Sequence, residues 1–400
     1  MNSKRGSSSI FLMVILAALI SIALALIHGV GEESVRSRAD GVINLAGDSV
    51  MSEFDDYVQK EYGLFLLNGT DRELTEKLRG YVEYAMSDWK GVHLEELRVS
   101  GGRFCVVNTE LIREQILEHS MLVKTGEVLK RMEEAEQQEN SMMKRHLRHG
   151  PTIVSLPSGQ IPRKSLTALA ESIAEKGDQA GEAFATGTEQ YLLGSYILTH
   201  FNHKNHAVDP EHFFRNEAEY ILGGELSDRK NEKRVEMALK AMRFPLNLAH
   251  IYSDSEKRAA TMGMAQLLTP GAAAAATQAV LAATWAYAEA DNDIKLLWQG
   301  HRVPVIKDAS CWATDLKGAV EGLMGGTAKP PVEKGYRYEQ YLQVLLFFQD
   351  ENIKLARILD LVQINVRKNH DQTFLIQEHA AGIAIEGRVN GVRYGYEKKY

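Results

Sequence analysis

The chain has 400 residues, of which 44% are apolar and 25% are charged, and this composition is typical of a folded globular protein. Its formal net charge of −7 argues against nucleic acid as a partner, because binding a phosphate backbone requires a basic surface. About 370 residues lie outside one strongly apolar segment near the amino terminus, which is enough for one large domain or two.

That segment runs from Ile10 to Ile27 and reads IFLMVILAALISIALALI. As a helix it would span about 27 Å, close to the thickness of the hydrocarbon core of a bilayer. Basic residues precede it and acidic residues follow it, so the positive-inside rule places residues 1–9 in the cytoplasm and the bulk of the chain outside the cytoplasm. We therefore predict a single-pass membrane helix over residues 10–28. The flanking charges are Lys4, Arg5, Glu32 and Glu33.

Two other interpretations of the segment involve cleavage. A secretory signal peptide usually has a shorter apolar core and ends at a small-x-small site, whereas residues 28–31 read HGVG. A pilin-type leader is cut just before the apolar stretch, and Gly6 is suitably placed for such a cut. The mature pilin chain then carries a glutamate five residues further on, where this chain has Phe11. Cleavage after Gly6 therefore stays an open alternative.

Beyond the anchor, helical periodicity dominates, and β-structure is predicted at two places. An amphipathic helix continues from the anchor over residues 31–62. A hairpin is predicted at residues 97–108 around Gly101-Gly102, and another at residues 383–397 around Asn390-Gly391, the strongest short hairpin signal. The fold class is therefore α+β, predominantly α-helical, with a helical body outside the cytoplasm. The other predicted helices cover residues 71–86, 110–132, 165–176, 188–201, 211–222, 228–252, 256–268 and 272–290, and residues 338–367 are predicted to form one or two further helices.

The predicted domain organisation follows these elements. Residues 29–132 form a helix with a small α/β region, and residues 133–162 form a charged helix and a linker that contains three prolines. Residues 163–372 form a helical domain, and residues 373–400 form the carboxy-terminal hairpin. The two cysteines, Cys105 and Cys311, allow either one disulfide or two free buried thiols.

The best cluster of reactive side chains is the segment THFNHKNHAVDPEH, which contains four histidines. His200 and His203 could face one side of a helix, and zinc binds imidazole readily. The alternative is a polar loop with solvated histidines, because Asn, Asp and Pro interrupt the helix and HExxH spacing is absent. The weak candidate metal ligands are His200, His203, His206 and His212.

The sequence predicts no catalytic residue and no cofactor. Acidic residues near a predicted helix start, Glu217, Glu219 and Glu225, fit helix caps and surface positions. We therefore expect a non-enzymatic protein that acts through assembly. The alternatives are a membrane-tethered metal-binding or hydrolytic domain that uses the histidine cluster, and a ligand-binding sensor domain outside the cytoplasm.

Several segments together resemble a known family. They are GSSSIFLMVILAALI, NTELIREQILEHS, MRFPLNLAHIYSD, WAYAEADNDIKLLWQGHRVPVIKDASCW and YEQYLQVLLFFQDENIKLARILDLVQINVR. Their order resembles an uncharacterised family of membrane-anchored bacterial proteins, classed as a domain of unknown function. The amino-terminal region of that family is similar to TadE/TadG pseudopilins of the Tad, or Flp, pilus machinery. The resemblance implies a pseudopilin-like region at residues 29–132, a role in pilus assembly or secretion in the bacterial envelope, and protein partners of that machinery.

Overall fold

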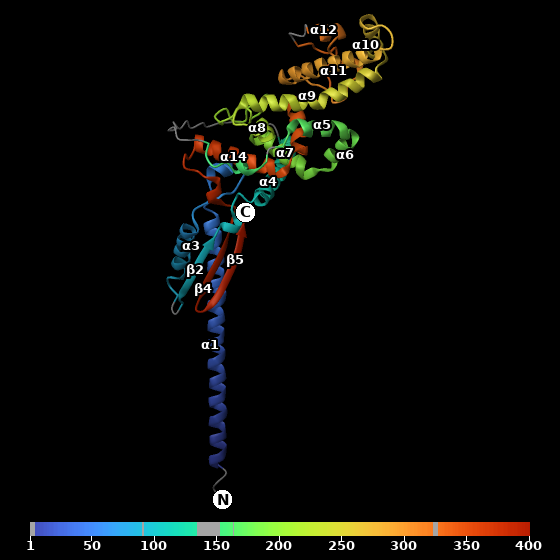
Figure 1. Cartoon of the computed structure of the whole chain (residues 1–400). Helices are drawn as coiled ribbons and strands as arrows, with labels where there is room; N and C mark the ends of the chain where they lie inside the picture. Colours follow the sequence, from blue (N-terminus) through green and yellow to red (C-terminus); the bar gives the residue numbers. More distant parts are fainter. Residues whose placement is uncertain (1–4, 90–91, 134–152, 163, 323–326) are drawn as a thin grey trace. The chain divides into compact units, whose positions relative to one another are not determined.

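The computed structural model describes residues 5–89, 92–133, 153–162, 164–322 and 327–400 (Figure 1). Helices make up most of the described chain, and its β-structure consists of one two-stranded and one three-stranded antiparallel sheet together with isolated β-bridges. This confirms the predicted α+β, predominantly α-helical fold. The chain forms two compact units. Unit 1 comprises residues 1–56, 65–108 and 377–400, and unit 2 comprises residues 57–64 and 109–376.

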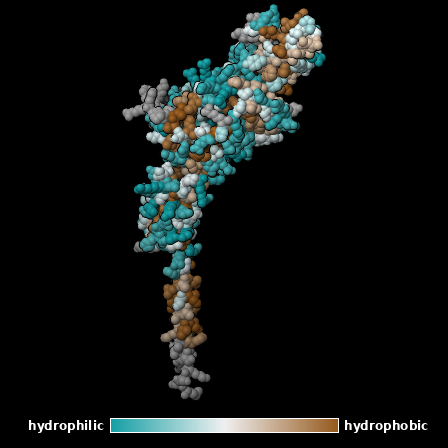
Figure 2. All heavy atoms as spheres, viewed as in Figure 1, coloured by the Kyte–Doolittle hydropathy of each residue, from teal (hydrophilic) through white to brown (hydrophobic). Residues whose placement is uncertain are grey.

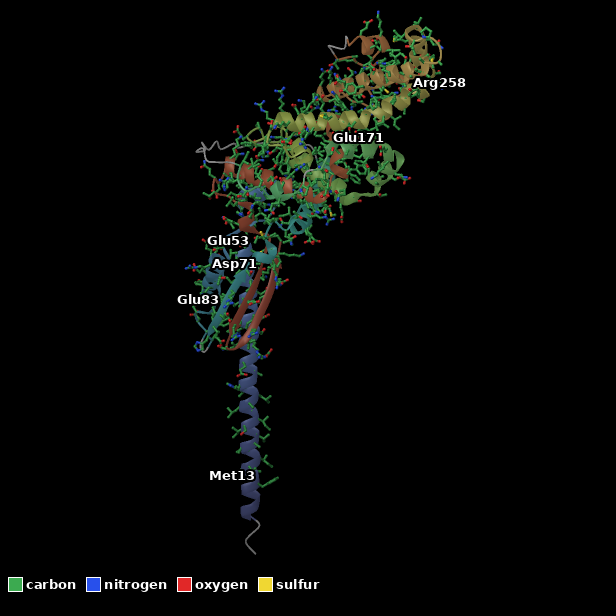
Figure 3. The ribbon with its side chains drawn as sticks, viewed as in Figure 1. Met13, Glu53, Asp71, Glu83, Glu171 and Arg258 are labelled. Carbon is green, nitrogen blue, oxygen red and sulfur yellow. The ribbon has the colours of Figure 1, made fainter. Side chains whose placement is uncertain are left out.

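Helix α1 (Arg5–Met51) is the longest element. Among the described residues, one helix is long and apolar enough to cross a membrane, and it is the part of α1 from Phe11 to Met51. The large apolar side chains between Phe11 and Val30 are 41–69% exposed, and Figure 2 shows this part of the helix covered by hydrophobic residues. Met13, labelled in Figure 3, belongs to this exposed apolar part of α1.

The helix predicted over residues 31–62 is interrupted. Helix α1 ends at Met51, and a separate short helix, α2 (Asp56–Tyr62), follows. Between them Phe54 forms an antiparallel bridge with Leu67, and its ring packs edge-on against Phe65 at 4.9 Å between centroids. An extended residue cannot continue a helix, so the prediction of one uninterrupted helix here was wrong.

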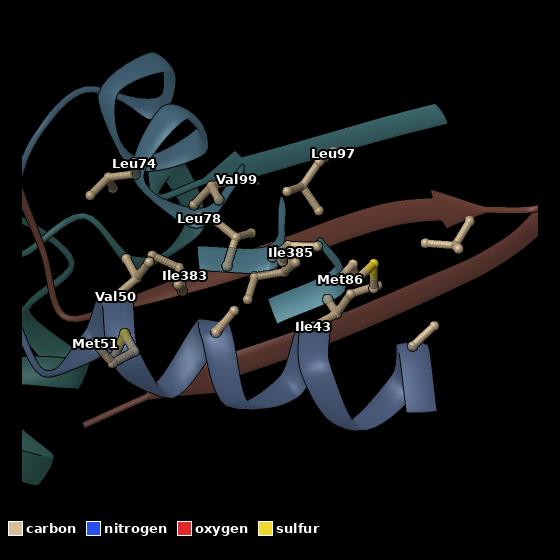
Figure 4. Close-up of a cluster of buried hydrophobic side chains, with 14 of the residues drawn as sticks. Ile43, Val50, Met51, Leu74, Leu78, Met86, Leu97, Val99, Ile383 and Ile385 are labelled. Carbon is tan, nitrogen blue, oxygen red and sulfur yellow. The ribbon is translucent and has the colours of Figure 1, made fainter. Parts of the chain in front are cut away.

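The core of unit 1 lies between the second half of α1, helix α3 (Asp71–Met86) and a three-stranded sheet (Figure 4). The sheet has the order β2 (Leu94–Ser100), β4 (Gly382–Val389), β5 (Val392–Lys399), and both pairs are antiparallel. Helix α3 lies along β2, where the backbone N–H of Val99 donates to Oγ1 of Thr75 at 2.9 Å. The labelled core side chains in Figure 4 include Ile43, Val50, Leu78, Val99 and Ile385.

Of the two predicted hairpins, the carboxy-terminal one is confirmed. Strands β4 and β5 are joined by Asn390 and Gly391, which have φ angles of 47° and 78°, as a two-residue hairpin turn requires. The hairpin predicted at residues 97–108 was wrong. Gly101 has a φ of −90° and its N–H donates to Oδ1 of Asp71, so the chain turns into the short 3-10 helix η1 (Gly102–Phe104). Strand β2 pairs instead with β4, from the other end of the chain.

Unit 2 is built from helices. Helix α14 lies in its core, because every residue from Ile353 to Arg367 is buried. Unit 1 also contains strands β1 (Leu67–Asn68) and β3 (His379–Ala380), which pair with each other. In the part of unit 2 that the structure describes, the α-helices besides α2 are α4 (Thr109–Glu133), α5 (Leu166–Lys176), α6 (Asp178–Thr186), α7 (Thr188–His200), α8 (Glu217–Gly223), α9 (Asp228–Ser253), α10 (Ser255–Leu268), α11 (Ala274–Trp298), α12 (Leu316–Glu321), α13 (Tyr338–Phe348) and α14 (Glu351–Asn369).

The alanine-rich segment at residues 272–290 forms most of α11, and Ala282, Ala286 and Ala290 have no exposed surface. This confirms a helix whose small-residue face packs inside a helical domain. The helix predicted at residues 211–222 begins only at Glu217, so residues 211–216 form part of a loop. Most of the predicted charged helix at residues 133–162 falls on residues 134–152, outside the described residues. Cys105 is half-buried in unit 1 and Cys311 is buried in unit 2, and both are free thiols.

Candidate functional site

A loop in unit 2, between α7 and α8, is organised by the buried side chain of Asn202. Its Oδ1 accepts from the backbone N–H groups of Val208 and Asp209, at 2.7 and 3.0 Å. Its Nδ2 donates to the carbonyl oxygens of Asp209, at 2.7 Å, and of Phe214, at 3.3 Å. One amide side chain thus fixes the backbone on both sides of Asp209.

Glu217, the first residue of α8, has no exposed surface and is held by three donors. Its carboxylate accepts from the N–H of Asn202 at 2.9 Å, from Nδ2 of Asn365 at 2.6 Å and from Nδ1 of His212 at 2.7 Å. Three hydrogen bonds and its place at the amino end of a helix offset the cost of burying this charge. Because Nδ1 of His212 donates to Glu217, Nε2 is the ring nitrogen that can accept.

Two carboxylates near that nitrogen complete a group of three potential metal ligands. A ligand atom of Glu61, on α2, one of Asp209 and one of His212 all lie within 4.8 Å of one another. Nε2 of His212 lies 3.9 Å from Oδ2 of Asp209 and 3.4 Å from the hydroxyl of Tyr62. His212 is buried, Asp209 is half-buried and Glu61 is exposed, so the group is open to solvent on the Glu61 side. One imidazole and two carboxylates suit a divalent transition metal ion.

Carboxylates also control the protonation of His212. Burial alone lowers the pKa of the imidazole, but the hydrogen bond and charge of Glu217, together with the charges of Asp209 and Glu61, raise that pKa above its usual value overall. In the absence of a metal ion, a proton on Nε2 would therefore face the carboxylates of Asp209 and Glu61. A metal ion and this proton compete for the same nitrogen.

The four histidines expected from the sequence do not form one cluster. His200 ends α7, where Nδ1 lies 2.9 Å from the carbonyl oxygen of Glu61 and Nε2 lies 3.1 Å from Nε2 of His119. His203 and His206 pair with each other through two backbone hydrogen bonds of 2.9 Å. Burial lowers the pKa of His200 and that of His203 to about 4, so both rings are neutral at neutral pH. Only His212 joins the carboxylate group.

Sequence reasoning missed the residues that complete the group. Asp209 lies three residues before His212 in the quoted histidine segment, and that spacing was a usable signal. Glu217 was assigned to the surface or a cap, and Glu219 with it, but both are fully buried. Glu61 comes from a distant part of the chain and carries no local pattern that points to the loop.

Comparison with known protein families gives a match over most of the chain. A family described as a family of unknown function, DUF5702, matches residues 127–391. This region includes Asp209, His212 and Glu217, whereas Glu61 precedes it. No curated protein and no solved structure matches the chain.

Proposed function

The chain belongs to the DUF5702 family, and we propose that it is a non-enzymatic, single-pass protein of the bacterial envelope. In this proposal the apolar part of α1 crosses the membrane, the amino terminus lies in the cytoplasm, and both units lie outside the cytoplasm. The protein acts by assembling with partners, as a pseudopilin-like component or accessory of Tad/Flp pilus assembly or secretion.

The continuity of α1 is the observation that carries the proposal. Between Phe11 and Ile27 the large apolar side chains of α1 are exposed, whereas Ala39, Ile43 and Val50 of the same helix have no exposed surface. Exposed apolar area costs about 25 cal/mol per Å² in water, and a contiguous patch of this kind marks a membrane or protein contact. A bilayer would cover this surface while the second half of the helix remains in the core of unit 1.

The same continuity favours a retained anchor over a signal peptide. Residues 28–31, where a signal peptidase would have to cut, are helical and lie in the middle of α1. Within the apolar part, the hydroxyl of Ser21 donates to the carbonyl oxygen of Ala17 at 2.8 Å. This bond satisfies a polar group that lipid could not satisfy. The helix is therefore compatible with burial in hydrocarbon along its apolar length.

The pseudopilin-like role is supported by the arrangement of unit 1. A short basic tail leads into an apolar helix, and the folded body of unit 1 packs on the continuation of that helix. In such an arrangement the anchors of neighbouring molecules can pack side by side in the membrane, and the bodies can contact partners outside it. Phe11 occupies the position of the pilin glutamate, so an accessory role fits as well as that of a fibre subunit.

Cysteine accessibility tests the topology. In a chain with both native cysteines replaced by serine, Glu33→Cys should react with a membrane-impermeant maleimide in intact spheroplasts. Ser7→Cys should react only after the membrane is permeabilised. A mature amino terminus at Met1 or at Ser7 is consistent with the anchor, and a start beyond residue 31 contradicts it.

Deletion of the gene tests the role in assembly. A strain that lacks the protein should lose Tad-type pili or Tad-dependent secretion, and the full chain should restore them. A chain whose first 31 residues are replaced by a cleavable signal peptide should be exported but should not restore them. Normal pili and secretion in the deletion strain would contradict the pilus role, and the labelling experiment would still decide the topology separately.

A further inference from the structure

We propose that Glu61, Asp209 and His212 bind a divalent metal ion, and that Zn²⁺ is the cation that this donor set fits best. The ligands would be Nε2 of His212 and one carboxylate oxygen from each acidic residue. The inference goes beyond the assembly role proposed above, since assembly through a membrane helix requires no metal ion.

A hydrogen bond to Glu217 orients the imidazole of His212 for metal binding. Metal-binding histidines almost always donate their second ring N–H to a carboxylate, a carbonyl or water, which fixes the tautomer and orients the ring. His212 has this arrangement: its Nδ1 lies 2.7 Å from a carboxylate oxygen of Glu217, which is itself fixed by Asn202 and Asn365. Nε2 then faces the two remaining carboxylates. The hydroxyl of Tyr62 lies 3.4 Å away, a long contact for a hydrogen bond, and competes weakly for this nitrogen.

Asp209 is held in position by hydrogen bonds to its backbone and its side chain. The side chain of Asn202 holds its backbone at both N–H and C=O. Its Oδ1 accepts from the N–H of Glu211 at 2.8 Å, and its Oδ2 is the oxygen that faces Nε2 of His212 at 3.9 Å. The carboxylate is thus oriented before any ion arrives, so binding costs little side-chain ordering at this residue.

The spacing of the three ligand atoms is close to that of a zinc site. Two ligands at about 2.0–2.2 Å from one zinc ion are about 3.4 Å apart in a tetrahedron. The three ligand atoms here lie within 4.8 Å of one another, so a movement on the order of 1 Å would close the site around an ion. Glu61 is exposed and can make that movement by rotating its side chain. Three protein ligands would leave one position for water, which is the coordination of an open zinc site.

Metal binding by the whole protein tests the proposal. Full-length protein in detergent is stripped with a chelator and titrated with ZnCl₂, and the bound metal is measured by calorimetry and by elemental analysis. We expect one Zn²⁺ per chain. The double variant Glu61→Gln, Asp209→Asn removes both carboxylates and keeps their size, and it should lose at least about 100-fold in affinity.

Matched variants separate the site from nonspecific binding. Glu211→Gln removes an exposed carboxylate next to the site and should bind zinc like the wild type. Glu217→Gln should weaken binding about 10- to 100-fold, since Glu217 orients the ligand without touching the metal. Because Glu61 is exposed, Glu61→Gln alone tests the proposal even if the variants at buried positions fail to fold.

The zinc titrations of the wild type and the variants either support the site or overturn it. A stoichiometry near one that falls in the double variant, with no change in Glu211→Gln, supports the site. No bound zinc in the wild type, or equal binding in the wild type and the double variant, overturns it. Membrane retention of the double variant is measured in parallel and should be unchanged, so failure of the metal site and failure of the anchor are distinguishable.

Discussion

Nε of Arg243 lies 3.0 Å from Oδ2 of Asp293, and neither side chain has any exposed surface. The ammonium group of Lys307 lies 2.6 Å from Oδ1 of the same aspartate and also contacts Glu289. Glu289 in turn accepts from the backbone N–H groups of Ala313 and Thr314. Two cations and two carboxylates therefore form one buried network, which holds the chain after α11 against α9 and α11.

Neutralising one member of this network should destabilise unit 2. Asp293→Asn leaves Arg243 and Lys307 with only one counter-charge, and breaking a buried pair in this way costs about 3–5 kcal/mol. Denaturant unfolding of the solubilised full chain measures the loss. The matched control is Glu76→Gln, whose partner Arg72 is 87% exposed, and an exposed pair of this spacing contributes only about 0.3–0.5 kcal/mol. Equal effects of the two substitutions would contradict a structural role for the network.

The contribution of Glu219 to the stability of unit 2 should increase as the pH falls. Burial raises the pKa of its carboxyl to about 7, although the N–H of Lys204 and the hydroxyl of Tyr338 both donate to Oε1. A raised pKa gives a stabilising contribution that is complete below the ordinary value of 4.5 and is lost as the pH rises through 7. Glu219→Gln retains the accepting oxygen and loses the titration. Its free energy of unfolding should therefore fall more steeply than that of the wild type between pH 7 and pH 5.

His203 should have the opposite effect. Its ring packs near Tyr338, and burial, followed by the charge of His206, lowers its pKa from 6.5 to about 4. A lowered pKa gives a contribution that is present above pH 6.5 and is lost as the pH falls toward 4. His203→Gln should therefore show a shallower loss of stability between pH 7 and pH 5 than the wild type. A pH profile parallel to that of the wild type for either variant would refute the assignment for that residue.

The elements that the sequence predicted correctly depend on local information. Asn390-Gly391 specifies its hairpin by the positive φ angles of the two turn residues, and the alanine-rich α11 follows from helical periodicity. The pairing of strand β2 with β4 could not be predicted, because nothing in residues 94–100 specifies a partner strand about 300 residues away. Tertiary packing decides which strands pair over such a separation. The same limit applies to the site. The His212 and Asp209 spacing is visible in the sequence, whereas the contribution of Glu61 depends on where α2 docks within unit 2.

Helix α1 offers a direct test of the core of unit 1. Ile43 has no exposed surface and packs against the sheet, whereas Leu45, two residues further along the same helix, is 67% exposed. Ile43→Ala should cost about 2–5 kcal/mol and increase the susceptibility of unit 1 to limited proteolysis. Leu45→Ala should change stability by less than about 0.5 kcal/mol. Both variants should remain in the membrane fraction. Equal protease resistance in the two would argue against packing of α1 in this core.

Two glycines of unit 2 should respond to alanine in opposite directions. Gly335 has a φ of +97°, and a Cβ there would lie 2.3 Å from the backbone N and Cα of Pro304. Two backbone hydrogen bonds of 2.9 Å between Val303 and Tyr336 hold Gly335 close to Pro304, so the two backbone segments cannot move apart without breaking these bonds. Gly335→Ala should therefore cost about 2 kcal/mol or more.

Gly263 is the matched control for that substitution. It lies inside α10, and apart from its chain neighbours and the adjacent backbone of the helix, no atom lies within 4 Å of the position that a Cβ would take. Gly263→Ala should stabilise the protein by about 0.5–1 kcal/mol, because alanine loses less conformational freedom than glycine when a helix forms. Thermal unfolding of the two variants, compared with that of the wild type, checks the direction of both predicted changes in stability. A melting temperature for Gly335→Ala at or above that of the wild type would show that the chain does not make the close approach at Pro304.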